Sequence, residues 1–387
     1  MKPASPRIEY GGALIGQEEF DAINSVIQSQ GGRRWTLGAE SLSFEKELAQ
    51  MSGVAHAVVV NSGSSALLLA ISALKLPRGS KVIIPALTFP TAYSSLLQNN
   101  LTPVVIDCDE NLNIDLKEVE KALKEHPDVK AVVAIHIAGN IVNLPRLREI
   151  VGERIIISDN CDGFGGTIDW KFIDAYADVS CISMHAAHII TMGEGGAILT
   201  NDPQIAATAR KMREWGRESG SDELTKLEGF PEDYRERYVF TEIGYNLKPL
   251  ELQCALGRVQ LRKLKDFKKK RRENFAKLRD VFVDHMDKFR VVQNTVIGAE
   301  SCWFGFPFIC KGIERKKVMD FFESLNIETR TIFSGNILRH PAYKGTGIQF
   351  GDLKNSNYVM EAGMFISNHP SMTPEQIYFI ENALTYL

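Results

Sequence analysis

The sequence has no apolar run long enough to span a bilayer, and its first residues, MKPASPRIEYGG, lack the apolar core of a secretion signal. We therefore expect a cytoplasmic protein with no membrane association. The formal net charge is only −3 over 387 residues, so the composition does not favour nucleic acid or an acidic membrane surface as a partner. The six cysteines are scattered and include no Cys-x-x-Cys pair. This argues against a structural zinc site and is typical of buried thiols in a reducing compartment.

What the sequence does contain is a series of short β-rich runs separated by helical patterns. With 44% hydrophobic and 24% charged residues, the chain is long enough for a large core and two domains. Several runs are continuous rather than alternating, as expected for strands buried on both faces of a mostly parallel sheet. The seven runs are AVVV (57–60), KVIIP (81–85), PVVID (103–107), AVVAIH (131–136), RIIIS (154–158), VSCIS (179–183) and AILT (197–200). Helical patterns over residues 64–74, 115–125 and 144–151 separate many of them, which predicts an α/β domain.

After about residue 250 the pattern changes to one long helix followed by shorter mixed elements. Helices are expected from Leu250 to about Val283, around Arg315 to Leu325 and after Pro374, with a strand around Trp303 to Ile309. We predict a large domain over residues 1–250 and a smaller α+β domain over residues 251–387.

The long helix contains a basic run, KLKDFKKKRR (263–272). Apolar residues fall near one face of this helix, which leaves the basic residues on the other face. These apolar residues are Leu261, Leu264, Phe267, Phe275 and Leu278. A solvated helix face is the favoured interpretation, and an anion-binding role is the alternative.

A candidate anion site lies where the first β-rich run ends. Asn61 follows that run, and Gly63 and Ser64 open a helix rich in Ala and Leu. The first N–H groups of a helix have no internal partners, and glycine lets the backbone approach a ligand closely. Together with a serine hydroxyl they would form a phosphate cradle, and Ser183 at the end of another run is a second candidate donor. An ordinary helix N-cap is the alternative.

Two further residues follow buried runs and are suited to hold a flat ring. Asp159 directly follows the run RIIIS, and a carboxylate buried at a strand end needs a partner such as a protonated ring nitrogen. Phe89, in ALTFPTAY, follows the run KVIIP and would stack on a ring face. The alternatives are a turn or an arginine pair for Asp159 and a core position for Phe89.

His188 is the candidate for proton transfer. It follows Ser183 by five residues and precedes a glycine-rich turn, GEGG (193–196). The ordinary pKa of histidine lies near cytoplasmic pH, which suits general acid–base catalysis, whereas a structural histidine is the alternative. No lysine occurs between Lys171 and Arg210, so no side-chain amine is available in this stretch.

In this order the motifs resemble the DegT/DnrJ/EryC1/StrS sugar aminotransferase superfamily of fold type I pyridoxal-phosphate enzymes. The resemblance rests on GGRRWTLG (31–38), residues 61–67, 85–93, 158–166 and 183–196, the GYN motif at 244–246, and residues 302–308. It implies the fold type I architecture, a large domain with a mostly parallel seven-stranded sheet and a smaller C-terminal α+β domain, and a homodimer that acts on nucleotide-linked keto sugars.

The resemblance also implies roles for individual residues. Asp159 would pair with the pyridine nitrogen, Phe89 would cover the ring, and Asp162 falls where the family often has Gln, His or Glu near the ring hydroxyl. The phosphate would be held by Gly63, Ser64 and Ser183 and, from the neighbouring subunit, by Asn246.

At the place of His188 the family normally has the lysine that binds the cofactor as a Schiff base. Histidine there is similar to the nucleotide-sugar 3-dehydratases that make 3,6-dideoxyhexoses. One kind acts on CDP-4-keto-6-deoxyglucose with an iron–sulfur cluster, and another acts on GDP-4-keto-6-deoxymannose without one. Since residues 213–246 contain no cysteine, we expect no iron–sulfur cluster.

The implied reaction is a C-3 dehydration. Glutamate would convert pyridoxal phosphate to pyridoxamine phosphate, His188 would act as general acid and base on a 4-keto-6-deoxy sugar nucleotide, and the product would be a 3,6-dideoxy-4-keto sugar. The alternatives are a nucleotide-sugar aminotransferase and a non-catalytic sensor of cofactor or sugar. Trp35 and Trp303 are candidates to flank the substrate, with a core position as the alternative. Arg330 is a candidate for binding a carboxylate or phosphate, with a surface ion pair as the alternative.

Overall fold

An eight-stranded, mostly parallel sheet forms the centre of the computed structural model, which describes residues 2–29, 35–218, 231 and 238–387. In spatial order its strands are β1 (His56–Val60), β9 (Gly196–Thr200), β8 (Val179–Ser183), β5 (Ile155–Asp159), β4 (Ala131–Ile135), β2 (Lys81–Pro85), β3 (Thr102–Ile106) and β14 (Ile348–Gln349). Only β9 runs against its neighbours. The predicted α/β class is therefore confirmed.

All seven predicted strands are present, but the predicted strand number is too low by one. The additional strand, β14, comes from the C-terminal part of the chain and pairs in parallel with β3, Ile348 opposite Val104. A strand of two residues shows no periodicity, so the sequence pattern could not reveal it.

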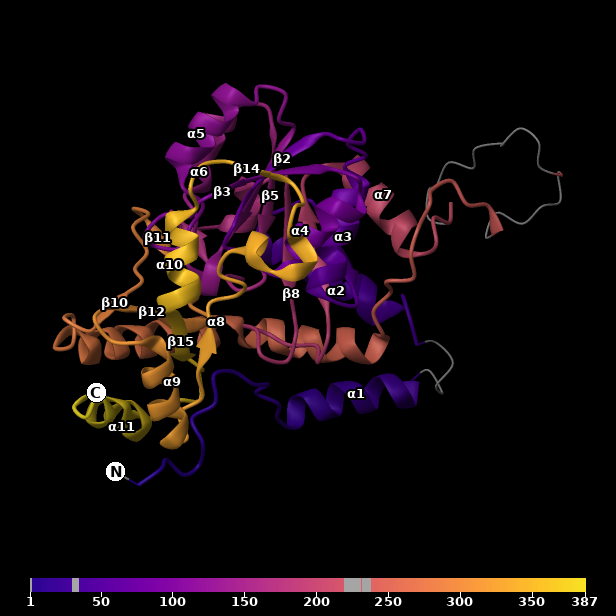
Figure 1. Cartoon of the computed structure of the whole chain (residues 1–387). Coiled ribbons are helices and arrows are strands. Elements are labelled where there is room, and N and C mark those ends of the chain that lie inside the picture. Colours follow the sequence, from indigo (N-terminus) through magenta and orange to yellow (C-terminus); the bar gives the residue numbers. More distant parts are fainter. Residues whose placement is uncertain (1, 30–34, 219–230, 232–237) are drawn as a thin grey trace.

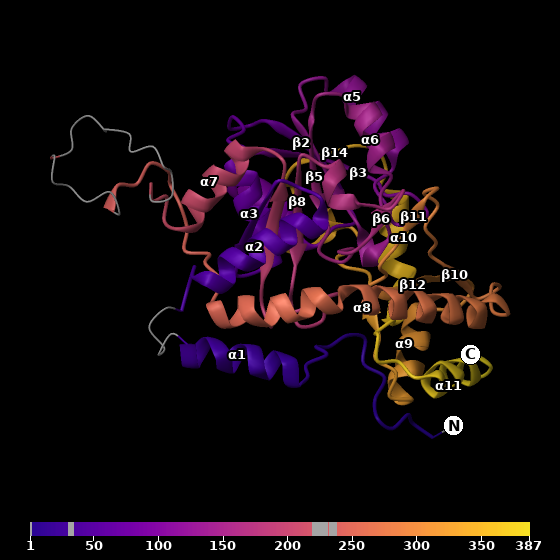
Figure 2. The same ribbon diagram turned by 180° about the vertical axis from the view of Figure 1, so that it is seen from behind.

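Helices cover both faces of the sheet (Figures 1 and 2). They are α2 (Ala39–Ser52), α3 (Gly63–Ala73), α4 (Pro90–Gln98), α5 (Leu116–Glu125), α6 (Leu144–Val151) and α7 (Pro203–Arg213). Side chains on one face of the sheet, such as those of Ile83 and Val132, belong to the core shared with α5 and α6. Their neighbours Val82 and Val133 belong to the larger core that includes α3 and α4, because successive side chains of a strand point to opposite faces.

The long helix α8 (Glu251–Val283) lies along one side of the sheet domain, with α1 (Gln17–Ser29) beside it (Figures 1 and 2). Beyond it, an antiparallel sheet is formed by β10 (Phe289–Val291), β12 (Gly305–Cys310), β15 (Gly363–Ser367) and β13 (Arg330–Thr331). It packs with α9 (Arg315–Ser324), α10 (Lys354–Ala362) and α11 (Pro374–Leu384). The helices expected after residue 250 and the strand near Trp303 are thus confirmed.

Smaller elements complete the described part of the chain. They are the three-stranded sheet of β11 (Ala299–Glu300), β6 (Thr167–Ile168) and β7 (Lys171–Phe172), and the 3-10 turns η1 (Ile137–Gly139), η2 (Ile173–Tyr176), η4 (Ile337–Arg339) and η5 (Pro341–Tyr343). Among the helices that the structure describes, none combines the length and apolar character needed to cross a bilayer.

The N-terminal segment lies against the C-terminal part rather than against the large sheet. Ile8 forms a parallel bridge with Ile327, and the amide of Ala4 donates to the carbonyl of Leu325. The domain boundary at residue 250 stays a prediction.

Candidate active site

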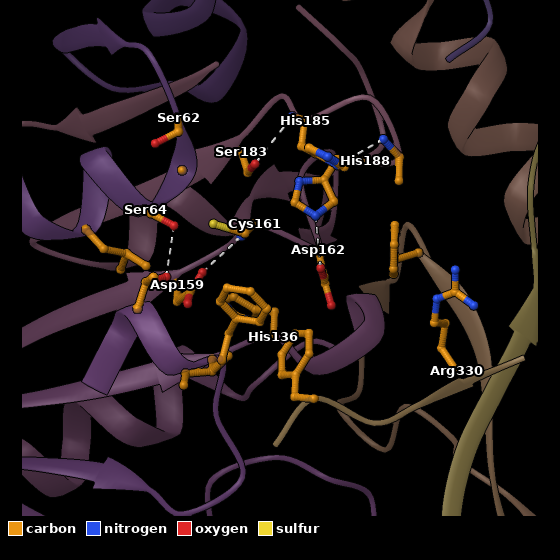
Figure 3. Close-up of a pocket in the computed structure, with 18 of the residues that line it drawn as sticks. Ser62, Ser64, His136, Asp159, Cys161, Asp162, Ser183, His185, His188 and Arg330 are labelled. Carbon is orange, nitrogen blue, oxygen red and sulfur yellow. Dashed lines mark hydrogen bonds and ion pairs between the residues drawn. The ribbon is translucent and has the colours of Figure 1, made fainter. Parts of the chain in front are cut away.

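A cavity of about 470 Å³ lies at the carboxyl ends of the parallel strands (Figure 3). Strand ends meet at one edge of an open α/β sheet, and the loops that follow them form the usual ligand crevice. The loops after β1, β2, β5 and β8 therefore bring most predicted site residues together. Those that line the cavity are Gly63, Ser64, Phe89, Asp159, Asp162, Ser183, His188 and Arg330.

One wall of the cavity is the N-terminus of α3. Ser62 is its N-cap and accepts a hydrogen bond from the amide of Ser65 at 3.1 Å. A Cβ atom on Gly63 would lie 2.5 Å from the Cβ of Ser183, so only glycine allows this helix end to approach the end of β8. The free amides, the hydroxyl groups and the helix dipole together suit a phosphate group.

Next to this wall lies Asp159, the last residue of β5. Its side chain is buried and accepts a hydrogen bond from the amide of Cys161 at 3.2 Å. Burial raises the pKa of this carboxyl. Among the residues that the structure describes, no Lys or Arg forms a salt bridge with Asp159, so a cationic ring nitrogen would supply the missing partner.

Phe89 presents its ring to the same cavity. The side chain is 47% exposed and meets the ring of Phe333 edge-on, with 5.7 Å between centroids. The alternative of a core position for Phe89 is therefore wrong. An exposed aromatic face beside a buried carboxylate fits a flat, protonated heterocycle.

His188 closes the cavity on the side of Asp162 (Figure 3). Its Nε2 atom lies 3.6 Å from Oδ1 of Asp162, and its ring meets Phe304 edge-on at 5.4 Å. Burial lowers the pKa of His188 to about 3. The pKa of Asp162 is raised to about 7, first by burial and then by the neighbouring charge of Asp159. No Lys of the described chain lines the cavity.

Three predicted residues lie elsewhere. Trp303 is 6% exposed and stacks on Phe275 at 4.1 Å, so its substrate role is replaced by the alternative, a core position. Trp35 is 44% exposed but does not line the cavity. Asn246 also lies outside it and accepts a hydrogen bond from Nζ of Lys248 at 2.5 Å.

Arg330 stands at the cavity with its guanidinium already engaged. It pairs with Glu328 and lies 4.3 Å from the ring centroid of Tyr10. It remains available as a positive group on the side of the cavity opposite α3 (Figure 3).

The sequence interpretation missed several residues of the site. Arg271 was assigned to a solvated helix face, but it is buried and donates to the backbone carbonyls of Phe304 (2.7 Å) and Trp303 (3.2 Å). A signal was present, since Arg271 follows Phe267 by four residues and precedes Phe275 by four, within the apolar stripe. Arg271 itself does not line the cavity. Residues that line it without a predicted role include Tyr10, Ser62, Thr91, His136, Cys161, His185 and Phe304.

Two motifs of the predicted resemblance lie partly outside the described residues: positions 31–34 of GGRRWTLG, and most of residues 219–237 in the cysteine-free segment. Within the described part, no group of three or more His, Cys, Asp or Glu side chains is placed to hold a metal ion. The absence of an iron–sulfur cluster stays a prediction.

The model of the DegT/DnrJ/EryC1/StrS aminotransferase family matches residues 14–385, and the chain belongs to this family. It is 33% identical over 383 residues to the GDP-4-keto-6-deoxy-D-mannose 3-dehydratase of Escherichia coli O55:H7, covering 95% of this chain and 96% of the relative. It is 32% identical over 405 residues to the dTDP-4-dehydro-2,6-dideoxy-D-glucose 3-dehydratase of Saccharopolyspora spinosa, covering 98% and 86%.

A solved structure of GDP-4-keto-6-deoxymannose-3-dehydratase with a trapped PLP-glutamate geminal diamine superposes with a TM-score of 0.90 at 31% identity. The alignment covers 97% of this chain and all (100%) of that one. The fold is therefore that of the pyridoxal-phosphate aminotransferases, and pyridoxal 5′-phosphate is the cofactor typical of the family.

Proposed function

We propose that this chain is a pyridoxamine-phosphate-dependent C-3 dehydratase of a nucleotide-linked 4-keto-6-deoxyhexose, with glutamate as the amine donor. The product would be a 3,6-dideoxy-4-keto sugar, an intermediate suited to deoxysugar and lipopolysaccharide O-antigen biosynthesis. The observation that carries the proposal is an imidazole, His188, in a cavity that no lysine of the described chain lines. The similarity to two nucleotide-sugar 3-dehydratases supports it.

The residues around the cavity fit the cofactor. Asp159 would pair with the ring nitrogen, and Phe89 would cover one ring face. The amides at the start of α3, with Ser64 and Ser183, would hold the phosphate, and we propose a homodimer in which Asn246 adds a contact from the neighbouring subunit. The fit rests on a buried carboxylate without a basic partner in the described chain and on a helix end that glycine keeps open.

Pyridoxamine phosphate, when bound, would supply an amine for the sugar ketone and a ring that withdraws electrons. His188 would take a proton at Nε2 and return it to the hydroxyl that leaves C-3. Because a neutral imidazole is needed to accept a proton, the lowered pKa of His188 favours the active form at neutral pH. Arg330 would bind a carboxylate or phosphate of the donor or the substrate.

The first test is the variant His188→Asn. We expect turnover of 4-keto-6-deoxy sugar nucleotides with glutamate to fall by about 10³-fold, because general acid–base groups contribute on this order. The affinity for pyridoxamine phosphate should change by less than about threefold, since the imidazole is not a phosphate or ring-nitrogen contact. Turnover would be followed by mass spectrometry and cofactor binding by absorbance; retained turnover would reject the proposal.

Product analysis separates the alternatives. A dehydratase releases free ammonia and a deoxy keto sugar, whereas an aminotransferase yields an amino sugar and a sensor yields neither. The variant His188→Lys is the matched probe, because it supplies the amine that is otherwise missing and should shift activity towards amino transfer. A variant without a covalent cofactor absorbance would show that residue 188 does not face the cofactor.

A further inference from the structure

Asp162 and His188 form a close pair inside the cavity. One carboxylate oxygen of Asp162, Oδ2, accepts a hydrogen bond from the amide of Ala138 at 3.0 Å. The other oxygen, Oδ1, lies 3.6 Å from Nε2 of His188. Ala138 lies in the turn η1 with a left-handed backbone (φ 52°), which aims its amide at the carboxylate. Figure 3 shows the imidazole directed at Asp162.

Both members of the pair are shielded from solvent. The side chain of Asp162 is 5% exposed and that of His188 is 19% exposed. Nε2 is the ring nitrogen that faces a titratable group, Asp162, whereas Nδ1 is buried. A contact of 3.6 Å is longer than a hydrogen bond, but such contacts often shorten when a ligand fills the site.

We propose that Asp162 is the positioning residue of His188: its carboxyl group faces Nε2 and holds the imidazole in one orientation. The proposal rests on the proposed function for its catalytic consequence. When Nε2 takes a proton, the electron pair of the broken C–H bond stays with the substrate and cofactor, and the imidazolium gains a carboxylate counterion. This differs from the contact with the ring hydroxyl that the family resemblance implies, because the side chain of Asp162 points to the base.

The charge that Asp162 presents to Nε2 depends on pH. Several titratable or charged groups surround His188 on different elements: Asp159, Cys161 and Asp162 after β5, His185 and Glu194 on the loop after β8, His136 after β4, Arg271 on α8, Arg330 on β13, and His369 after β15. Burial lowers the pKa of His188 to about 3, and burial together with Asp159 raises the pKa of Asp162 to about 7. Below about pH 7 Asp162 is a carboxylic acid, which donates to Nε2 and occupies its lone pair. Above that pH the ionised carboxylate leaves the lone pair free to take a proton and is the counterion of the imidazolium that results. Nε2 is therefore available as a base only when Asp162 is ionised.

The test is an NMR titration of the cofactor-free protein labelled with ¹⁵N-histidine, from pH 6 to 8.5. We expect the Nε2 signal of His188, assigned with His188→Asn, to shift about a midpoint near pH 7 as the hydrogen bond from the carboxylic acid is lost, and to stay fixed in Asp162→Asn. Signals of His188 that ignore pH in the wild type, or that titrate alike in Asp162→Asn, would overturn the proposal. The matched control is Glu194→Gln, because Glu194 lies 3.7 Å from His185 and its loss should change His185 rather than His188.

The catalytic arm uses the loaded enzyme. We expect Asp162→Asn to lower kcat by about 10²-fold, with KM for the sugar nucleotide and the affinity for pyridoxamine phosphate changed by less than about threefold. An affinity loss with unchanged kcat would assign Asp162 to the cofactor instead. If the wild type shows no dehydration at all, the proposed function fails, whereas the NMR titration of the pair still stands or falls by itself.

Discussion

The absence of a Cβ atom at Gly63 determines how closely the start of α3 approaches the end of β8. Any side chain there would bring a Cβ to 2.5 Å from Cβ of Ser183 and 3.1 Å from Sγ of Cys161. Either the end of β8 or the start of α3 would have to move, and both carry the predicted phosphate contacts.

We therefore expect Gly63→Ala to weaken the binding of pyridoxamine phosphate by about tenfold or more, since overpacking of this kind costs about 1–3 kcal/mol. Absorbance titration measures the affinity. The control is Gly12→Ala, where the nearest atom to a new Cβ is a carboxylate oxygen of Glu9 at 3.9 Å. Equal affinities of the two variants would show that the close approach of α3 and β8 is not needed.

At the scale of elements, the start of α8 stabilises the start of α2. The N-cap of α2, Gly38, has no side chain to bond the free amides of the first turn. Glu251 takes this role across the fold, because its buried carboxylate accepts the amides of Gly38 (2.8 Å), Glu40 (2.9 Å) and Ser41 (3.0 Å). The negative charge also suits the positive end of the helix dipole.

The variant Glu251→Gln should lower the free energy of unfolding by about 2 kcal/mol, because charge-assisted hydrogen bonds are replaced and a buried amide N–H₂ meets N–H groups. Urea denaturation measures the loss. Glu273→Gln is the control on the same helix: its carboxylate pairs only with exposed lysines among the described residues and should change stability by less than about 0.5 kcal/mol. A similar small effect of Glu251→Gln would contradict the capping role.

Over the whole molecule, the buried histidines and the buried Asp162 change the stability of the folded state in opposite directions as pH falls. Burial lowers the pKa of His136 and His188 to about 3 and that of His369 to about 4. Histidines of this kind make the folded state less stable as pH falls through about 6.5, their pKa in the unfolded chain, because only the unfolded chain then takes up protons. Asp162, with its pKa raised to about 7, has the opposite effect, since the folded state binds the proton first.

The variant His136→Gln measures how much one buried histidine contributes to this pH dependence of stability. Nε2 of His136 lies 3.0 Å from Oγ of Ser158, and Nδ1 accepts the amide of Val142; an amide side chain offers similar groups without the charge change. From pH 7.5 to 5.5 the variant should gain about 1.4 kcal/mol relative to the wild type, measured by urea denaturation at both pH values. His285→Gln, at a partly exposed position after α8, should show no such gain. A pH-independent difference for His136→Gln would mean that this histidine takes up its proton at the same pH in the folded and unfolded states, which would contradict the lowered pKa.

Much of the site could be predicted because its residues follow buried strands. Ser183 ends a β-rich run, Asp159 directly follows one, and Gly63 and His188 come a few positions after one; parallel strands end at a common edge. Helix α8 was equally visible through its period. The features that escaped prediction depend on contacts between distant segments: β14 beside β3, Tyr10 beside Arg330, and Trp303 on Phe275.

By itself, the sequence determined the order of strands and helices, the glycine that opens the helix end and the imidazole without a neighbouring lysine, because period and residue chemistry are local properties. Only the tertiary structure decided that Arg271 turns inward, that Trp303 belongs to the core and that Asp162 faces His188. Each of these outcomes depends on the groups that lie within a few ångströms of the side chain. Packing between remote parts of the chain brings those groups there.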